Sequence, residues 1–170
     1  MVAASVRVRP AQHADCGAIT AMFDDFAAQH HRWRPEQFRP ATIGFTAAIL
    51  QTWLEQTNEL HLAAEIDQMV IGYARATRFD GFASEFMFQR RGVHVYLLMV
   101  APAARRKGAG RALFQAVEAW AAEFEAEVVG LNVSAQNATA RAFYAALGYD
   151  LVNEYLIKTL RRVRRFEADP

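Results

Sequence analysis

A chain of 170 residues, 53% hydrophobic and 22% charged, predicts one well-buried domain over residues 1–170, without disordered or low-complexity segments. Its formal net charge of +1 argues against nucleic-acid or membrane binding by the chain as a whole, because such roles usually need a strongly charged surface. The sequence has neither a signal-peptide pattern nor an uncharged run of about eighteen residues, so we expect a cytoplasmic protein.

A strand and a helix are predicted at the start of the chain. Residues 5–9 alternate between polar and apolar side chains, and Pro10 ends the pattern. Over residues 16–26 the apolar side chains recur at helical spacing. Cys16, the only cysteine, lies on the apolar face of this helix. We interpret it as a small core residue and not as a nucleophile.

Residues 30–40 are predicted to form a polar and aromatic connection bounded by prolines. A second helix is expected after it, because three large apolar residues recur every four positions: Phe45, Ile49 and Trp53. His30 and His31 are adjacent, but neighbouring residues do not share a helical face. No third ligand stands at zinc spacing, so we expect no metal site.

A hairpin and an aromatic connection are predicted next. Residues 60–65 and 69–77 have strand-like composition and are separated by a turn at Asp67-Gln68. Residues 78–92 contain four phenylalanines, which need burial somewhere. Three arrangements stay open: this segment extends a long hairpin, covers a substrate cleft, or packs against a second subunit in a homodimer.

The rest of the chain is organised around an uncharged run, residues 93–100, which predicts a strand buried on both faces. An amphipathic helix is expected from Ala109 to Phe124, where apolar side chains recur at i, i+3, i+4 and i+7. Between strand and helix lies a loop with two glycines and several basic residues: Arg105, Arg106, Lys107, Gly108, Ala109, Gly110 and Arg111.

This loop has the features of an anion site. Glycines let backbone N–H groups approach a ligand at the positive end of the helix dipole. The Arg and Lys side chains add charge, so we predict a phosphate or pyrophosphate ligand. The alternative is a surface loop whose basic residues only keep it solvated. No Walker A motif occurs, and Leu113 stands where a dinucleotide fingerprint needs its third glycine.

A strand over residues 128–133 and a helix over residues 138–147 complete the predicted elements. Asn137 is a typical helix N-cap, and Gly148 stands where a left-handed residue ends a helix. The string N-V-S-x-x-N-x-x-A-R-x-F-Y-x-x-L-G-Y runs from Asn132 to Tyr149 across these elements.

Two motifs together resemble the GNAT superfamily of N-acetyltransferases. The first is R-x-x-G-x-G from Arg105 to Gly110, directly after a strand ending Leu-Met-Val, and the second is the string from Asn132 to Tyr149. The resemblance covers the chain from Val6 to about Leu160. It implies an α/β (α+β) fold with a central mixed and splayed sheet of six to seven strands, flanked by about four helices. It also implies acetyl-CoA as the cofactor.

The resemblance further implies a set of cofactor-binding residues. The backbone of Leu98, Met99 and Val100 would pair with the pantetheine and the acetyl group, and the loop from Arg105 to Arg111 would hold the pyrophosphate. Asn132 and Asn137 would contact the cofactor, and Tyr144 would lie close to the thioester sulfur. A tyrosine, with a pKa near 10, can donate a proton to a thiolate. Tyr144 is therefore the candidate general acid, unless it only packs helix against sheet.

The general base is less clear. Many members of the superfamily place a glutamate on the organising strand, where this sequence has Tyr96. His94 has the same side-chain parity as Tyr96 and a reference pKa of about 6.5, so it is our candidate base. A buried structural histidine is the alternative, and Glu85 in the aromatic connection is a weaker candidate base.

The expected function is acetyl transfer from acetyl-CoA to a primary amine. Residues 30–38 and 79–88 would line the acceptor side with aromatic surface and few carboxylates, which suits a small amine with a partly apolar body or a peptide N-terminus. The absence of a carboxylate from residues 93–100 keeps a second hypothesis open: a GNAT-fold module that binds acyl-CoA or a partner without transferring anything.

Overall fold

The computed structural model describes residues 5–39, 46–81, 85, 88–158 and 160. The strands are β1 (Arg7–Pro10), β2 (Glu59–Ile66), β3 (Met69–Asp80), β4 (Arg91–Val100) and β5 (Val128–Leu131). The α-helices are α1 (Cys16–Trp33), α2 (Ala47–Leu54), α3 (Ala109–Glu123) and α4 (Ala138–Ala145), and short 3-10 turns span His13–Asp15 and Pro102–Ala104. Within the described helices, no stretch is both long and apolar enough to span a membrane.

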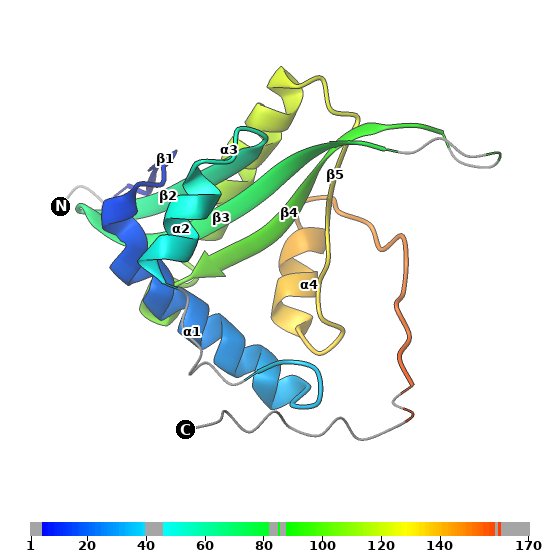
Figure 1. Cartoon of the computed structure of the whole chain (residues 1–170), viewed down its shortest axis with the longest axis horizontal. Coiled ribbons are helices and arrows are strands. Elements are labelled where there is room, and N and C mark those ends of the chain that lie inside the picture. The colour runs from blue at the N-terminus through cyan, green and yellow to red at the C-terminus, as the bar shows by residue number, and fades with distance from the viewer. Residues whose placement is uncertain (1–4, 40–45, 82–84, 86–87, 159, 161–170) are drawn as a thin grey trace.

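The strands form one mixed sheet in the order β1-β2-β3-β4-β5 (Figure 1). Neighbours pair antiparallel from β1 to β4, whereas β4 and β5 are parallel. The sheet has five strands in the described residues, so the expected count of six to seven was too high. Residues 150–158 and 160, which follow α4, form no strand and are exposed. Their apolar residues come in adjacent runs, such as Tyr155-Leu156-Ile157, which define no single buried strand face.

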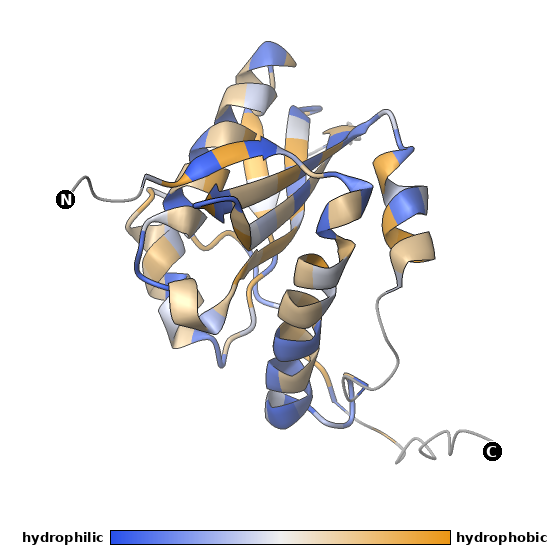
Figure 2. Ribbon diagram, turned by 90° about the vertical axis from the view of Figure 1, so that its left-hand side faces the viewer, coloured by the Kyte–Doolittle hydropathy of each residue, from blue (hydrophilic) through white to orange (hydrophobic). Residues whose placement is uncertain are grey.

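The sheet is covered by helices on both faces (Figure 1). On one face α1 and α2 pack on a cluster that includes Ile19, Leu50 and Tyr73. On the other face Phe114 and Val117 of α3 pack on the inward side chains of β2, β3 and β4. The central strands consequently carry mostly apolar colours in Figure 2. This two-sided cover agrees with the uncharged composition of residues 93–100 in β4.

Helix α1 is longer than predicted and includes the first residues of the expected connection. His30 Nδ1 lies 2.8 Å from the Phe26 carbonyl oxygen, and the His30 ring packs between the rings of Phe26 and Trp33 at centroid distances of 4.0 and 5.2 Å. These contacts between residues three and four apart stabilise another helical turn. The assignment of residues 30–33 to a connection was therefore wrong.

The two hairpins of the sheet have different ends. Asp67 and Gln68, between β2 and β3, both have positive φ values, 48° and 64°, as the two central residues of a type I′ turn do. The hairpin of β3 and β4 is much longer, and its pairing extends to Asp80 and Arg91. The aromatic connection therefore adopts the long-hairpin arrangement in its described part. Two of its phenylalanines, Phe82 and Phe86, lie outside the described residues.

Candidate active site

The basic glycine loop meets the N-terminus of α3, as the sequence predicts. Gly108 is the N-cap residue, with a left-handed φ of 89°, and no side chain caps the helix there. A side chain at Gly108 would meet no atom within 4 Å, so its surface is open to a ligand. Arg106, Lys107 and Arg111 are exposed, and within the described residues none of them forms an ion pair. The first N–H groups of α3 and these three cations are thus available to one anion.

Arg105 differs from the other basic residues of the loop. Its Nη2 donates to Asp25 Oδ2 of α1 at 2.5 Å, and its Nε donates to the Val100 carbonyl oxygen at 3.2 Å. These two bonds tie the loop to the end of β4 and to α1. Arg105 is therefore placed to position the loop, with its charge already paired.

Strands β4 and β5 separate beside this loop. Their parallel register runs from Gly92↔Val128 to Val95↔Leu131 and ends there. The register of β4 with β3 shifts at the same point, between Arg75↔Leu97 and Ala76↔Val95, so Tyr96 is a bulge residue. Beyond Val95 the β5 side of β4 has no ladder partner in the described part of the chain. This split is the splay that the resemblance implies, and it leaves residues 97–100 with a strand partner only on the β3 side.

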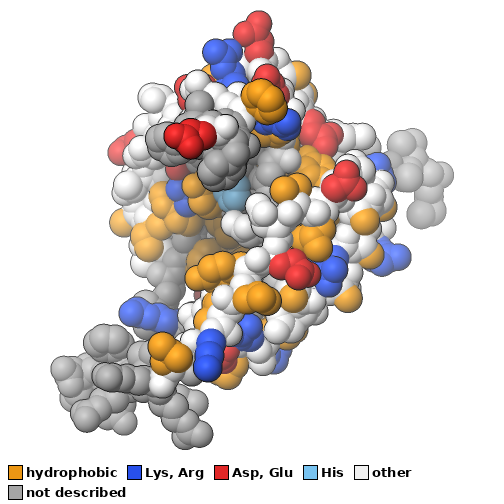
Figure 3. Space-filling view, turned by 90° about the vertical axis from the view of Figure 1, so that its right-hand side faces the viewer, with side chains coloured by type: hydrophobic (Ala, Val, Ile, Leu, Met, Phe, Trp, Pro, Cys, Tyr) orange, Lys and Arg blue, Asp and Glu red, His pale blue; other side chains and the backbone are white. Residues whose placement is uncertain are grey.

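A hollow of about 450 Å³ lies at the point where β4 and β5 begin to separate. It is lined by Thr77, Phe79, His94, Tyr96 and Asn132. The rings of His94 and Tyr96 touch edge to face with centroids 4.7 Å apart. Figure 3 shows a histidine at the base of a hollow bordered by hydrophobic side chains. His94 and Tyr96, two positions apart, therefore project on the same side of β4, as their spacing predicts.

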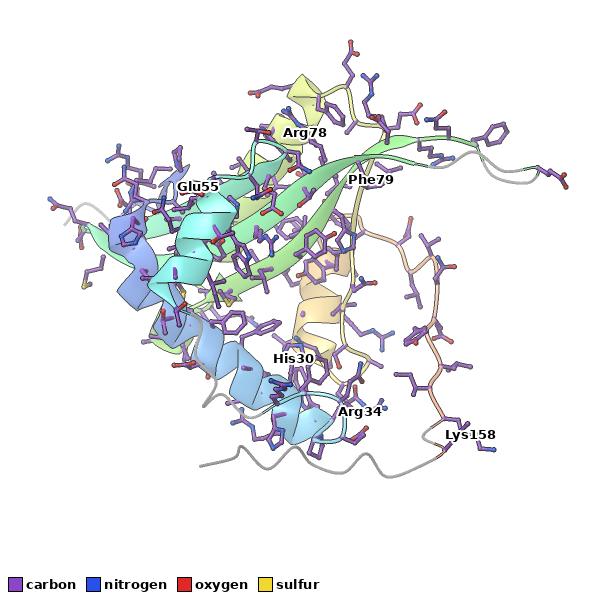
Figure 4. The ribbon with its side chains drawn as sticks, viewed as in Figure 1. His30, Arg34, Glu55, Arg78, Phe79 and Lys158 are labelled. Carbon is purple, nitrogen blue, oxygen red and sulfur yellow. The ribbon has the colours of Figure 1, made fainter. Side chains whose placement is uncertain are left out.

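Phe79 forms one wall because its cross-strand partner is a glycine. Gly92 stands opposite Phe79 in the register, and a Cβ on Gly92 would lie 2.4 Å from Phe79 Cζ. The side chain of Arg78, the preceding residue, projects from the other face of β3 (Figure 4). There its guanidinium lies 4.2 Å from the ring centroid of Trp120 in α3. The small residue at position 92 thus lets an aromatic ring lie across the strand toward the hollow.

His94 and Tyr144 both have shifted acidities. Burial lowers the pKa of His94, so its imidazole is neutral at pH 7 and able to accept a proton. Burial raises the pKa of Tyr144 to about 12, because its ring packs against Phe114, Phe143 and Tyr149. No described protein group hydrogen-bonds to the Tyr144 hydroxyl. It stays protonated at neutral pH and keeps its proton available for another acceptor.

The two asparagines lie in different settings. Asn132 lines the hollow beside His94. Asn137 is the N-cap of α4, where its Oδ1 accepts a hydrogen bond from the Ala140 N–H at 3.0 Å. The cap engages that oxygen, so only the amide N–H groups of Asn137 remain for a cofactor. Glu85 lies in the connection between β3 and β4 and does not line the hollow.

The structure adds a polar cluster that the sequence analysis did not single out. Arg75 donates to both carboxylate oxygens of Glu59, at 2.6 and 2.8 Å, and its guanidinium lies 4.0 Å from the Trp53 ring centroid of α2. His61 Nδ1 lies 2.8 Å from the Tyr73 hydroxyl. The signal in the sequence is a series of polar residues at alternate positions of β2 and β3, on a face that the helices cover. Three or more metal-type ligands do not come together anywhere in the described residues.

Solved structures share this fold, among them that of an aminoglycoside N-acetyltransferase. The tetramutant of the BH1408 protein from Bacillus halodurans superposes with a TM-score of 0.85 at 20% identity, over 91% of this chain and 99% of that chain. The aminoglycoside N-acetyltransferase AAC(6')-Iy, in complex with CoA, superposes with a TM-score of 0.67 at 16% identity, over 93% of this chain and 96% of that chain. The architecture is thus one that N-acetyltransferases use.

Sequence comparison identifies the family itself. The model of the acetyltransferase (GNAT) family matches residues 19–149. An uncharacterized N-acetyltransferase of Bacillus subtilis (strain 168), YhfO, is 29% identical over 146 residues, which cover 85% of this chain and 90% of that protein. The chain belongs to the GNAT acetyltransferase family.

Proposed function

We propose that the protein is an N-acetyltransferase that moves an acetyl group from acetyl-CoA to a small primary amine by direct attack in a ternary complex. The observation that carries this proposal is the split of β4 from β5 after Val95, flanked by the open basic loop and by a hollow that contains a neutral histidine. The three parts correspond to a site for the cofactor arm, a site for its phosphates and a site for the acceptor.

The residues present fit acetyl-CoA. Arg106, Lys107, Arg111 and the backbone at Gly108 would hold the pyrophosphate. The edge of residues 98–100 that faces away from β3 would hydrogen-bond to an extended amide chain, as a neighbouring strand does, except at the Val100 carbonyl oxygen, which accepts from Arg105. When bound, acetyl-CoA supplies a thioester that activates the acetyl group for attack.

Two side chains would carry out the two proton transfers of the reaction, one from the amine and one to the leaving sulfur. An alkylammonium group with a pKa of about 10.4 must lose a proton before it can attack, and the neutral His94, which lines the hollow, would accept that proton. Tyr144, with its hydroxyl protonated and unpaired, would donate a proton to the leaving sulfur. This assignment gives each of the two proton transfers a group in the required protonation state.

The acceptor is proposed to be an amine on a partly apolar body. Phe79 and Tyr96 provide aromatic walls, and Asn132 adds one polar side chain. The nearby carboxylate of Glu59 is neutralised by Arg75, so a multiply charged amine gains little attraction. An α-amine, with a pKa of about 7.7 to 8.0, is a favourable case because more of it is neutral at pH 7. A peptide N-terminus or a small arylalkylamine therefore fits better than an aminoglycoside or a polyamine.

A second candidate function is binding of acyl-CoA without transfer, which the absence of a carboxylate from β4 favours. Thiol release from acetyl-CoA, measured against arylalkylamines, amino acid amides, short peptides, aminoglycosides and spermidine, separates the two functions. We expect amine-dependent release, highest with an apolar amine. Binding of acetyl-CoA without release for any amine would establish the second function. Best turnover with spermidine or an aminoglycoside would contradict the proposed acceptor class.

A further inference from the structure

Three strands carry a carboxylate, a hydroxyl and an imidazole side by side. Glu59 of β2 stands opposite Thr77 of β3, and Thr77 stands opposite His94 of β4. Directly opposed residues have Cβ atoms about 4.5 to 5.5 Å apart and project on the same face of the sheet. The row therefore runs across the sheet from a buried acidic group to the candidate base.

The carboxylate end of the row is fixed and charged. Arg75 holds both oxygens of Glu59, and His61 Nε2 lies 3.1 Å from Oε2 without being aligned for a hydrogen bond. The hydrogen bonds from Arg75 are the main cause of the lowered pKa of Glu59, and the Thr77 hydroxyl adds to it. Glu59 is thus an anion, and Thr77 is one of the groups that favour its charged form.

Thr77 has the right chemistry for the middle position. Its Oγ1 is buried, yet it has no well-aligned hydrogen-bond partner in the described residues, a state that costs free energy unless a partner completes it. A hydroxyl can donate one hydrogen bond and accept others. Thr77 also lines the hollow together with His94, and it stands opposite His94 in the register of β3 and β4.

We propose that Thr77 is a positioning residue for His94. Oγ1 forms neither bond in the structure, but after a small adjustment of the side chains its hydroxyl donates to Glu59 and accepts the N–H of the His94 ring. This leaves the other ring nitrogen with its lone pair for the acceptor amine. A neutral imidazole has one donor and one acceptor nitrogen, so the bond at one nitrogen decides the state of the other. When the free nitrogen takes the amine proton, the resulting cation is stabilised through Thr77 by the Glu59 carboxylate. The carboxylate missing from β4 is in this way supplied by β2, two strands away.

This inference rests on the proposed role of His94 as base, but its main test does not need turnover. The ring nitrogens of labelled histidines report their tautomer by NMR in the protein alone, and a His94→Gln variant assigns the His94 signals. We expect a single His94 tautomer in the parent protein. The Thr77→Val variant, which keeps the shape and loses the hydroxyl, should give a mixture of tautomers, and Thr77→Ser should restore one.

A second measurement uses the pH profile. The ionisable groups around the row are His61 and Arg75 beside Glu59, and Tyr96 beside His94. The pKa of His94, followed by NMR, should fall in Thr77→Val and in Glu59→Gln, because each change removes support for the imidazolium. Turnover in Thr77→Val should fall about ten- to a hundredfold, whereas Thr77→Ser should stay within about threefold of the parent.

The outcomes separate this inference from the proposed function. An unchanged His94 tautomer and pKa in Thr77→Val overturns the positioning role, whatever the activity. A change of tautomer in a protein that acetylates no amine overturns the proposed function and leaves the positioning role standing. If Thr77→Val does not fold, Thr77→Ala and Glu59→Gln provide the same NMR comparison, and an unchanged pKa in both overturns the inference.

Discussion

Tyr144, the proposed general acid, is a buried side chain whose packing and acidity can be examined together. Three aromatic rings surround it, and this burial raises its pKa to about 12. A phenol with a raised pKa stays protonated at working pH, but it is also a weaker acid, so it gives its proton to a thiolate less readily than an exposed tyrosine would. What the surrounding rings supply is position, because they hold the side chain in place.

Replacing Tyr144 with Phe should lower kcat by roughly a hundredfold or more. The change removes the proton donor and hardly alters the packed volume, so acetyl-CoA binding should stay nearly the same. Steady-state kinetics combined with direct titration of acetyl-CoA measures both effects. Phe143→Leu, on the preceding residue of α4, is the matched packing control. A parent-like kcat in Tyr144→Phe would assign Tyr144 to packing alone.

The motif residues could be predicted from the sequence because their chemistry is local. Gly108 and Gly148 both have the positive φ values, 89° and 87°, that their positions in the chain require. Asn137 caps α4 as expected. The role of Arg105 could not be predicted, because its partner Asp25 lies 80 positions earlier. A pattern within one segment does not reveal which charges another segment will neutralise.

The junction of loop and helix at Gly108 is the element on which cofactor binding depends in our proposal. If acetyl-CoA binds the folded protein, it should raise the melting temperature, with a stabilisation of about 2.7 kcal/mol at a hundred times Kd. Gly108→Glu should abolish this shift, since it places a like charge at the phosphates and an L side chain at a left-handed φ. Thermal unfolding with and without acetyl-CoA is the measurement.

Gly17→Glu, where a side chain would also meet open space, is the control for the added charge in that experiment. It should keep the shift in melting temperature. If the parent protein shows no shift at millimolar acetyl-CoA, the loop is not a cofactor site.

An ion pair also joins two elements at the start of the chain, β1 and the 3-10 turn before α1. Arg9 donates to both oxygens of Asp15, at 2.7 and 2.8 Å, and the Gln12 N–H adds a third bond. Hydrogen bonds from Arg9 are the main cause of the lowered pKa of Asp15. Asp15→Asn should therefore cost about 3 kcal/mol of stability at pH 7, as breaking a buried ion pair does.

The sign of the pH effect follows from the lowered pKa of Asp15. Its contribution is complete above the ordinary aspartate pKa, near 4, and is lost as the pH falls through the lowered value. Urea unfolding of parent and Asp15→Asn at pH 7 and pH 3 should show a smaller difference at pH 3. Glu36→Gln, which removes an exposed ion pair with Arg34, should change little at either pH. An equal difference at both pH values for Asp15→Asn would contradict the assignment.

Among the elements, the sequence predicted those that carry their own signals. The starts of α1 at Cys16, α3 at Ala109 and α4 at Ala138 and the end of β4 at Val100 agree with the predictions from glycines, caps and periodicity, whereas β4 begins two residues before the predicted strand, at Arg91. The extension of α1 to Trp33 depends on the packing of His30 against Phe26 and Trp33. The polar composition of residues 30–33 does not reveal these contacts. The row of Glu59, Thr77 and His94 depends on register, and register is set by three strands together.

At the scale of the whole molecule, the two edges of the sheet differ. The β1 edge carries Arg7, Arg9 and Pro10, residues that discourage further pairing. The β5 edge has no such protection, and the exposed segment after α4 carries a group of large apolar side chains: Leu151, Val152, Tyr155, Leu156, Ile157 and Leu160. In the described residues β5 pairs only with β4. The free edge of β5 in one copy and the apolar segment after α4 in another copy could therefore form a contact between the two copies.

We therefore expect the protein to self-associate through the segment from Leu151 to Leu160. Sedimentation velocity over a dilution series should show a dimer that dissociates on dilution. A Tyr155→Lys, Leu156→Glu double variant should shift the equilibrium toward monomer, because charged side chains are costly to bury. Glu154→Lys, a change at a residue that is already charged, should leave it unaltered. A parent protein that is monomeric at every concentration would contradict this expectation.

The point where β4 leaves β5 also has a kinetic consequence. In the proposed function, the hollow that would take the acceptor borders the split that the cofactor arm would fill, so without the cofactor one wall of the acceptor site would be missing. The amine should therefore add second, in a compulsory order. A dead-end amine analogue should then be competitive against the amine and uncompetitive against acetyl-CoA, whereas competitive or mixed inhibition against acetyl-CoA would mean that the acceptor site is complete in the free protein.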